Sequence, residues 1–395
     1  MLQPTTKQER ITAVDALRGF ALLGIILANL PWAGDRVVHS DLDETMNFVH
    51  LFLIQSKFIT IFSILFGFGF YIQFERSLKG GARFNRYFMI RMTLLFLIGC
   101  LHGYLIWMGD IIRTYALCGM LLLLVRNWPV KRLLWLAFVF NVVLTAAMFI
   151  ATGALNLESF YDFEPALWEE HLTATSYERY LWVNYMIDNW RNFIPDMPVT
   201  LFFSFGNIAL GYALAKMRFF DSGLKHLKKV KRYLVAGGVV LGLPFNYALY
   251  LVYSGKLELE LSLLWVPFGV CLGIVLLALT YMILFQWAYE VLGVQKVLRL
   301  FEPVGRTALT NYIAQSMIYL VFFHHVLSWF QLYGKLSFAE TWIAGFLFFA
   351  VQMVASKLWL RYFRQGPLEY LWKRVAYSFT KRSVSRSIPS IPVGD

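Results

Sequence analysis

Apolar residues recur in long runs that are separated by shorter polar segments. A run of about 20 apolar residues, wound as an α-helix, crosses the roughly 30 Å of hydrocarbon in a bilayer. Ten runs fit this description, at residues 16–34, 49–74, 89–108, 110–126, 132–153, 199–217, 233–253, 261–287, 307–330 and 340–361. The pattern predicts an all-α, polytopic membrane protein of about ten transmembrane helices. We expect one transmembrane domain over residues 1–377 and a Ser- and Pro-rich, disordered tail over 378–395.

Basic residues gather in alternate connections between these runs. They occur in the N-terminal tail, at residues 75–88, 126–132, 216–232 and 288–306, and in the C-terminal tail. The intervening connections are acidic or poor in Lys and Arg. Because basic loops stay in the cytoplasm, both termini are expected there, and the number of spans is expected to be even.

Composition agrees with a membrane protein and narrows the partners. Of the 395 residues, 58% are hydrophobic and only 15% are charged, against about 25% charged in soluble domains. The net charge of +12 is explained by the basic loops, so we expect a lipid bilayer and no nucleic acid as partner. The three cysteines lie in apolar runs and predict no disulfide framework. The oligomeric state is open, with a homodimer as one option.

The segment 154–198 is the one sizeable connection on the predicted external side. It is acidic and carries six large aromatic residues, namely Trp168, Tyr177, Tyr180, Trp182, Tyr185 and Trp190. These residues suit an amphipathic anchor at the membrane interface or a lid over a cavity. The anchor is the favoured interpretation.

Polar residues within the runs are functional hypotheses, because ionisable groups are costly at membrane depth. On the cytoplasmic side they are Asp15, Arg18, Arg306, Asn311, Gln315, Lys357, Arg361 and Arg364. The first two are three residues apart, and by themselves they indicate a helix N-terminus with a snorkelling arginine. The polar stripe that includes Asn311 and Gln315 indicates either glue between helices or the wall of a hydrated cavity. Arg361 and Arg364 could clamp phosphates or mark an ordinary basic membrane edge.

On the external side, ionisable groups gather in the outer half of neighbouring runs. They are Lys57, His102, Asp110, Arg113 and the consecutive pair His324 and His325. Histidine is a natural general base, and Asp110 could orient or charge His102. Arg113 and Lys57 could bind an anionic group, whereas an Asp110–Arg113 pair that only staples a turn is the alternative. The pair at 324–325 points in two directions on a helix and indicates an interfacial role.

No metal-ligand spacing, phosphate loop, dinucleotide fingerprint or nucleophile elbow is present. We therefore expect no metal and no bound cofactor.

Five segments carry a family resemblance, namely VDALRGFALLGIILAN, KFITIFSILFGFGF, LHGYLIWMGDIIRTYA, GRTALTNYIAQS and YFRQGPLEYLWK. With them the chain resembles the YeiB-like family of bacterial inner-membrane proteins (domain of unknown function 418). The resemblance covers nearly the whole chain except the tail and the segment 154–198. It implies a multi-pass protein of the bacterial cytoplasmic membrane.

The first run is also similar to the opening helix of the wider transmembrane acyltransferase group, which reads D-x-x-R-G/A with His or Asn eleven residues after the arginine. Asp15, Arg18, Gly19 and Asn29 match the Asn version. The resemblance implies an acyl-CoA-type donor taken from the cytoplasm and an acceptor on the opposite face. The base of the His-type members stands where this chain has Asn29. In the Asn-type member a histidine follows in the next loop, and His39 is the nearest candidate by spacing.

The leading prediction is a membrane-embedded acyltransferase. His102 and Asp110 would be catalytic, and the acceptor would be a small molecule, lipid or glycan. Donor or substrate contacts would come from Arg18, Asn29, Lys57, Arg113, Arg306, Asn311, Gln315, Arg361 and Arg364. The alternatives are a transporter of a small anionic metabolite by alternating access, and a structural or signalling subunit.

Overall fold

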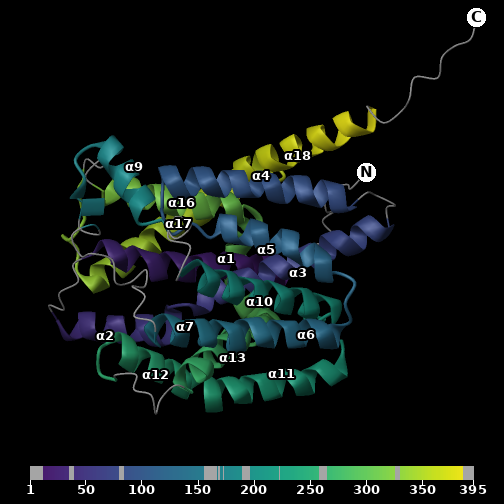
Figure 1. Ribbon diagram of the computed structural model, residues 1–395, viewed down its shortest axis with the longest axis horizontal. Coiled ribbons are helices and arrows are strands. Elements are labelled where there is room, and N and C mark those ends of the chain that lie inside the picture. The colour runs from purple at the N-terminus through teal and green to yellow at the C-terminus, as the bar shows by residue number, and fades with distance from the viewer. Residues whose placement is uncertain are drawn as a thin grey trace, which may run out of the picture.

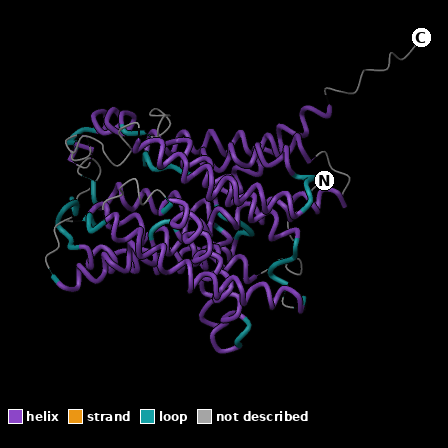
Figure 2. Tube along the Cα trace, turned by 60° about the horizontal axis from the view of Figure 1, so that its bottom comes forward, coloured by secondary structure: helices purple, strands orange, loops and turns teal. Residues whose placement is uncertain are grey.

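The computed structural model describes residues 12–34, 40–79, 84–154, 167, 170–171, 173–188, 196–221, 223–257, 265–324 and 330–385. Within these ranges the chain is helical and has no strand (Figure 2). The helices are α1 (Thr12–Asn29), α2 (Asp41–Val49), α3 (Lys57–Lys79), α4 (Phe84–Leu105), α5 (Ile112–Val125), α6 (Val130–Phe138), α7 (Thr145–Ala154), α9 (Tyr177–Met186), α10 (Asp196–Lys216), α11 (Lys225–Gly237), α12 (Leu243–Tyr253), α13 (Val266–Tyr289), α14 (Leu292–Leu298), α15 (Glu302–Arg306), α16 (Ala308–Phe322), α17 (Phe338–Tyr362) and α18 (Pro367–Ser385).

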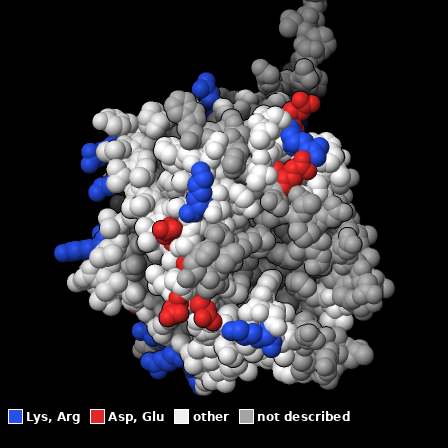
Figure 3. All heavy atoms as spheres, turned by 90° about the vertical axis from the view of Figure 1, so that its left-hand side faces the viewer, with Lys and Arg blue, Asp and Glu red and all other residues white. Residues whose placement is uncertain are grey.

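The long helices run side by side along one axis (Figure 1). One end of the bundle carries the N-terminus and the start of α11, and we call it the N-terminal end. The opposite end carries α9, and we call it the α9 end. Acidic and basic side chains are scattered over the described surface of the α9 end (Figure 3).

Eight helical segments of the described chain are long and apolar enough to cross a membrane. Short π-helical stretches, at Val139–Leu144 and Gly238–Gly242, join α6 to α7 and α11 to α12 into two of these segments. Two further apolar helices, α5 and α16, have only 14 and 15 residues. They coincide with the predicted runs 110–126 and 307–330. The all-α membrane character is confirmed, whereas the count of ten spans and the direction of the termini stay predictions.

The second predicted span is broken between α2 and α3. The π-helical stretch His50–Ile54 ends at Gln55, and Ser56 has a left-handed φ of 68°. The break frees two backbone carbonyls, which accept hydrogen bonds from side chains. Leu51 O accepts from Lys57 Nζ at 3.0 Å, and Leu53 O accepts from Tyr281 of α13 at 3.1 Å. Neighbouring side chains therefore satisfy these two carbonyls of the unwound backbone.

The core centres on α3 and α10, which touch backbone to backbone. Gly67 of α3 faces the carbonyl of Ile208, and Gly211 of α10 faces the carbonyl of Ile64. A Cβ at Gly211 would lie 1.8 Å from Ile64 O, and one at Gly67 would lie 1.9 Å from Ile208 O. Only glycine permits this approach, which is the usual way for membrane helices to gain contact area.

The polar stripe of α16 joins this helix to α1 and α17. Asn311 Nδ2 donates to Thr307 Oγ1 at 2.7 Å and to Ser356 Oγ at 2.9 Å. Gln352 Nε2 donates to Asn311 O at 3.0 Å, and Gln315 Nε2 donates to Leu22 O at 3.1 Å. These groups are buried. Of the two roles expected for the stripe, the contacts favour interhelical glue.

Helix α18 folds back against α4 and α16 and leans away from the bundle toward its C-terminus (Figure 1). Glu369 caps the start of α16, since Oε1 accepts from Leu309 N at 2.7 Å and Oε2 accepts from Thr310 Oγ1 at 2.6 Å. Trp372 donates to the carbonyl of Arg91 and lies under its guanidinium, 4.2 Å from ring centroid to Cζ. The helix continues to Ser385, beyond residue 378, where composition predicted the disordered tail to begin. Residues 386–395 lie outside the described ranges.

The α3–α10 contact predicts a strong effect of one added methyl group. Gly211→Ala should lower the free energy of unfolding by at least about 2 kcal/mol, because the new Cβ would overlap backbone atoms that cannot move aside. Gly237→Ala on α11 is the matched control, since its Cβ would meet nothing closer than 3.8 Å. Thermal unfolding of the purified protein measures both variants. A Gly211→Ala protein that melts like the wild type would contradict the described packing.

Candidate functional site

A buried charge cluster lies toward the α9 end, where α4 and α5 meet the segment that follows α9. Its members are His102, Asp110, Arg113 and Asp188, all of them buried. His102 Nδ1 lies 2.8 Å from Asp110 Oδ2. Arg113 donates through Nε and its backbone N to Asp110 Oδ1, at 3.2 and 2.9 Å. The predicted proximity of His102, Asp110 and Arg113 is therefore present in the fold.

Asp188 completes the cluster and was not singled out from the sequence. Arg113 Nη2 donates to Asp188 Oδ2 at 2.7 Å, and Nη1 donates to Oδ1 at 3.2 Å. This two-pronged pairing uses the planar fork of the guanidinium. The sequence places Asp188 in an acidic connection 75 residues from its partner, and nothing in that connection distinguishes it from the other acids.

The hydrogen bond to Asp110 fixes the tautomer of His102. An ionised carboxylate can only accept, so Nδ1 carries the proton and Nε2 presents its lone pair. His102 Nε2 is buried and has no hydrogen-bond partner among the described residues. The imidazole lies against the ring of Tyr312 on α16, with 5.3 Å between centroids. This arrangement, a carboxylate that orients a histidine with one free nitrogen, is that of a base and its orienting group.

Two glycines of α4 make room for the cluster. A Cβ at Gly99 would lie 2.6 Å from Arg113 N, and one at Gly103 would lie 2.4 Å from Arg113 Nη2. These two small residues thus receive the start of α5, including the Arg113 side chain.

Helix α9 covers the cluster from the α9 end. Its side chains bind the last carbonyls of α4, which a helix terminus leaves without partners. Tyr177 donates to Leu105 O at 2.7 Å, and Tyr180 donates to Ile106 O at 2.5 Å. Asn184 Nδ2 lies 2.7 Å from Gly103 O and 2.9 Å from Tyr104 O. This part of the segment 154–198 therefore packs on the bundle as a cover, with Tyr180 and Asn184 fully buried.

A second buried ring cluster adjoins this cover. His324 lies edge-on to His171 and Tyr180, at 5.0 and 4.8 Å between centroids, and Trp107 packs against Tyr319 nearby. Burial, together with the charge of His324, lowers the pKa of His171 well below its usual value. His325 and the alternative base His39 lie outside the described residues.

The residues predicted to hold a donor lie mainly at the N-terminal end. Arg18 Nη1 pairs with Asp15 Oδ1 at 3.2 Å, and Asp15 O touches Gly305, beside Arg306. Arg306 Nη2 donates to the carbonyl of Arg364 at 3.3 Å. Arg361 and Arg364 are exposed. The fold thus brings Arg18, Arg306 and Arg364 to one region.

Helix α16 connects this region with the cluster. Tyr312, which contacts His102, stands four residues beyond the first residue of α16, a rise of about 6 Å. Tyr312 also accepts a hydrogen bond through its hydroxyl from Ile111 N at 3.3 Å. Asn311 lies between the two sites and belongs to the hydrogen-bonded contact between α16 and α17.

Two predicted contact residues are not part of the cluster. Lys57 is fully buried and donates to Leu51 O, and none of its described contacts reaches Arg113. Asn29, at the end of α1, is exposed. In the described chain, no group of three or more His, Cys, Asp or Glu residues is placed to hold a metal ion.

The comparisons with known proteins agree on the family. The model of the family described as "Protein of unknown function (DUF418)" matches residues 214–379. The chain is 33% identical to the uncharacterized protein YxaH of Bacillus subtilis, over 95% of this chain and 96% of that protein. It is 29% identical to the uncharacterized protein YeiB of Escherichia coli, over 96% of this chain and 99% of that protein. No solved structure matches the chain.

The cluster predicts that Asp188 matters for stability although it lies far from its partner in sequence. Asp188→Ala should lower the free energy of unfolding by about 3–5 kcal/mol, because it leaves the buried Arg113 with a single carboxylate. Glu170→Ala is the control, since it removes a carboxylate from another arginine pair of the same segment, Glu170–Arg179, that is exposed. Thermal unfolding should separate the two variants. Equal melting temperatures would show that the Arg113–Asp188 pair contributes little.

Proposed function

The chain belongs to the YeiB-like DUF418 family, and we propose that it is a membrane-embedded acyltransferase with His102 as general base. The observation that carries the proposal is the orientation of a buried histidine by Asp110, with Nε2 left free. The resemblance of the first helix to transmembrane acyltransferases supplies the reaction class. We further propose ten spans with both termini in the cytoplasm of a bacterial cell, in its cytoplasmic membrane.

The chemistry follows from the charges of the cluster. His102 Nε2 takes the proton of an acceptor hydroxyl or amine as the acceptor oxygen or nitrogen attacks the thioester carbonyl. The carbon–sulfur bond then breaks, and the imidazolium returns the proton to the departing thiolate. With a neutral imidazole, two carboxylates face one guanidinium. Proton uptake at Nε2 leaves the cluster electrically neutral, which suits a site without water.

Arg113 acts as a positioning residue in this scheme. Its Nε and both terminal nitrogens donate to Asp110 and Asp188. It therefore holds Asp110 in place for His102 rather than binding a substrate anion. The basic residues near Arg18 and Arg306 would receive the phosphates of the donor at the N-terminal end. The thioester would then reach His102 along α16, past Tyr312.

Helix α9 would admit the acceptor. His102 is only 1% exposed, so a substrate reaches Nε2 only after a covering element moves. Tyr177, Tyr180 and Asn184 hold this cover to the end of α4 by four hydrogen bonds. Their carbonyl partners can bind water when the cover lifts, which makes α9 the element best suited to open.

One observation favours the alternative of transport. The break at Gln55 and Ser56, beside the buried Lys57, resembles the discontinuous helices that bind substrate in transporters. A transporter of a small anion would catalyse counterflow of labelled acetate or succinate in proteoliposomes without any thioester. Consumption of acyl-CoA without counterflow supports the acyltransferase, and counterflow without consumption supports the transporter.

The acyltransferase proposal predicts the effect of removing the base. His102→Gln should lower acyl-CoA consumption by about 10²–10⁴-fold, because the amide can still donate to Asp110 but cannot take a proton. His226→Ala on α11 is the control, since His226 is exposed and far along the chain from the cluster. Thiol release from acetyl-CoA and longer acyl-CoAs by the purified protein in liposomes measures both. Full activity of a folded His102→Gln protein would refute the role of His102.

A further inference from the structure

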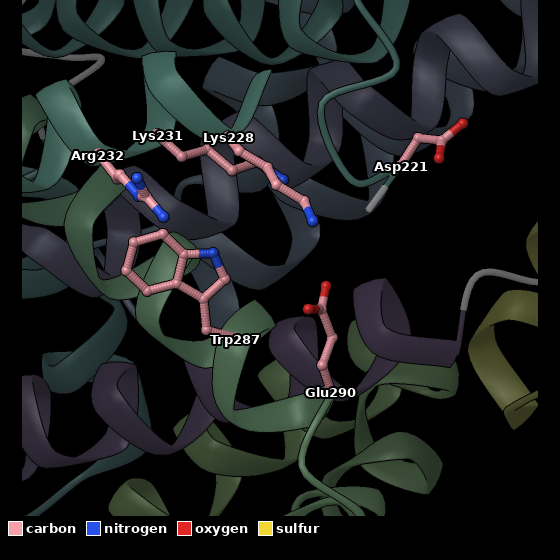
Figure 4. A pocket seen from close by; sticks show the side chains of 6 residues that line it. All are labelled: Asp221, Lys228, Lys231, Arg232, Trp287 and Glu290. Atoms are coloured by element: carbon pink, nitrogen blue, oxygen red, sulfur yellow. The ribbon is translucent and has the colours of Figure 1, made fainter. Parts of the chain in front are cut away.

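A second polar site lies at the N-terminal end, between α11 and the end of α13. It is a cavity of about 190 Å³, lined by Asp221, Lys228, Lys231, Arg232, Trp287 and Glu290 (Figure 4). None of these residues belongs to the cluster around His102 or to the basic region near Arg18. The cavity is therefore separate from both of these sites.

Three cations of one helix face line the cavity. Lys231 and Arg232 follow Lys228 by three and four residues, so each is a neighbour of Lys228 on the surface of α11. Lys231 is only 3% exposed, and its Nζ donates to Gln286 Oε1 at 2.8 Å. The ammonium also lies over the Phe219 ring, 4.9 Å from its centroid. An ammonium group has three donors, so Lys231 still has a donor for a ligand. Lys228 and Arg232 are exposed and make no hydrogen bond or ion pair with a described residue.

The two acids of the site offset these cations only in part, although both act electrostatically on Lys231. Asp221 pairs with Arg218 at 2.8 Å and accepts from Gly223 N at 2.9 Å. Its carboxylate points away from the lysines in Figure 4. Glu290 faces the cavity and accepts from Gln286 Nε2 at 3.4 Å. Three positive charges thus face two carboxylates, one of which is shared with Arg218. Like charges on neighbouring helix positions repel, and an anion between them relieves that repulsion.

The position of the cavity indicates where such an anion comes from. Helix α11 lies at the edge of the bundle (Figure 1), and Val230 and Tyr233 on it are 39% and 65% exposed. The apolar segment that contains α11 is also among those least buried within the protein. A basic pocket beside lipid-facing residues, at the end of a spanning helix, is suited to lipid headgroups. The half-buried Trp287 fits the same interfacial level.

We propose that this pocket binds a phosphate group, supplied by the headgroup of an anionic phospholipid. Lys231 forms the floor of the site, and Lys228 and Arg232 close over the phosphate from the solvent side. Glu290 limits the affinity because it places a negative charge beside the ligand. The proposal is independent of the acyltransferase reaction, since it shares no residue with that site.

The test compares lipid retention by the purified full chain in native mass spectrometry. The probes are phosphatidylglycerol and phosphatidylcholine, added in equal amounts in detergent. The wild type should retain phosphatidylglycerol preferentially. The double variant Lys228→Ala/Arg232→Ala should lose roughly tenfold or more of this preference, as expected for two interfacial cations. Glu290→Gln should increase the retention of phosphatidylglycerol, because it removes a negative charge beside the ligand.

Matched variants make the outcome decisive. Lys229→Ala/Lys296→Ala removes the same charge from exposed positions that do not line the cavity, and it should leave the preference unchanged. An equal loss in both double variants would refute the pocket, because it would indicate general attraction to a basic surface. Unchanged retention in all variants would also refute it. Stabilisation by inorganic phosphate or ADP that depends on Lys228 and Arg232, without lipid preference, would retain the phosphate site and assign it a soluble ligand.

Discussion

The absence of water in the bilayer core governs this structure more than any other constraint. A buried polar group there must find its partner within the protein, or it costs several kcal/mol. The described contacts answer this demand at three interruptions of helices. Glu369 closes the start of α16, α9 closes the end of α4, and Lys57 and Tyr281 satisfy the break before α3. Segments far apart in sequence are joined where a helix begins, ends or unwinds.

The same constraint explains why the charged side chains near His102 pair with one another. One carboxylate alone would leave donors of the buried Arg113 unpaired, because its five donors call for more than one acceptor. Asp110 and Asp188 supply these acceptors, and Asp110 has an oxygen left for the histidine. These contacts hold the four side chains in one arrangement, which in the proposed reaction would already exist before a substrate arrives. Such preorganisation is the main source of electrostatic stabilisation in enzymes.

Much of the architecture could be predicted from the sequence, because run length and hydropathy are local properties. All ten predicted runs overlap apolar helices of the structure. The spacing of eight residues was also enough to bring His102 and Asp110 into one group. Asp188 could not be identified, since its partner is set by how the long connection folds back. The sequence also left two roles open for Asn311 and Gln315, contact between helices or the wall of a hydrated cavity. The same polar stripe would serve either role, because the sequence does not say whether it faces a helix or water. The helical extension of α18 beyond residue 378 depends on its docking near Arg91 and Thr310, which composition does not encode.

The hydrogen bonds that attach α9 determine in which medium the site could open. Lifting α9 would expose three carbonyl groups of α4 and that of Ile106, which follows it, and each would then need a replacement donor. Only an aqueous phase offers such donors in number, whereas acyl chains offer none. The proposed opening would therefore take up water molecules, and its equilibrium would shift with osmotic pressure. Dehydrating conditions at the α9 end would then hold the site shut, and hydration would couple the surroundings to access to the buried histidine.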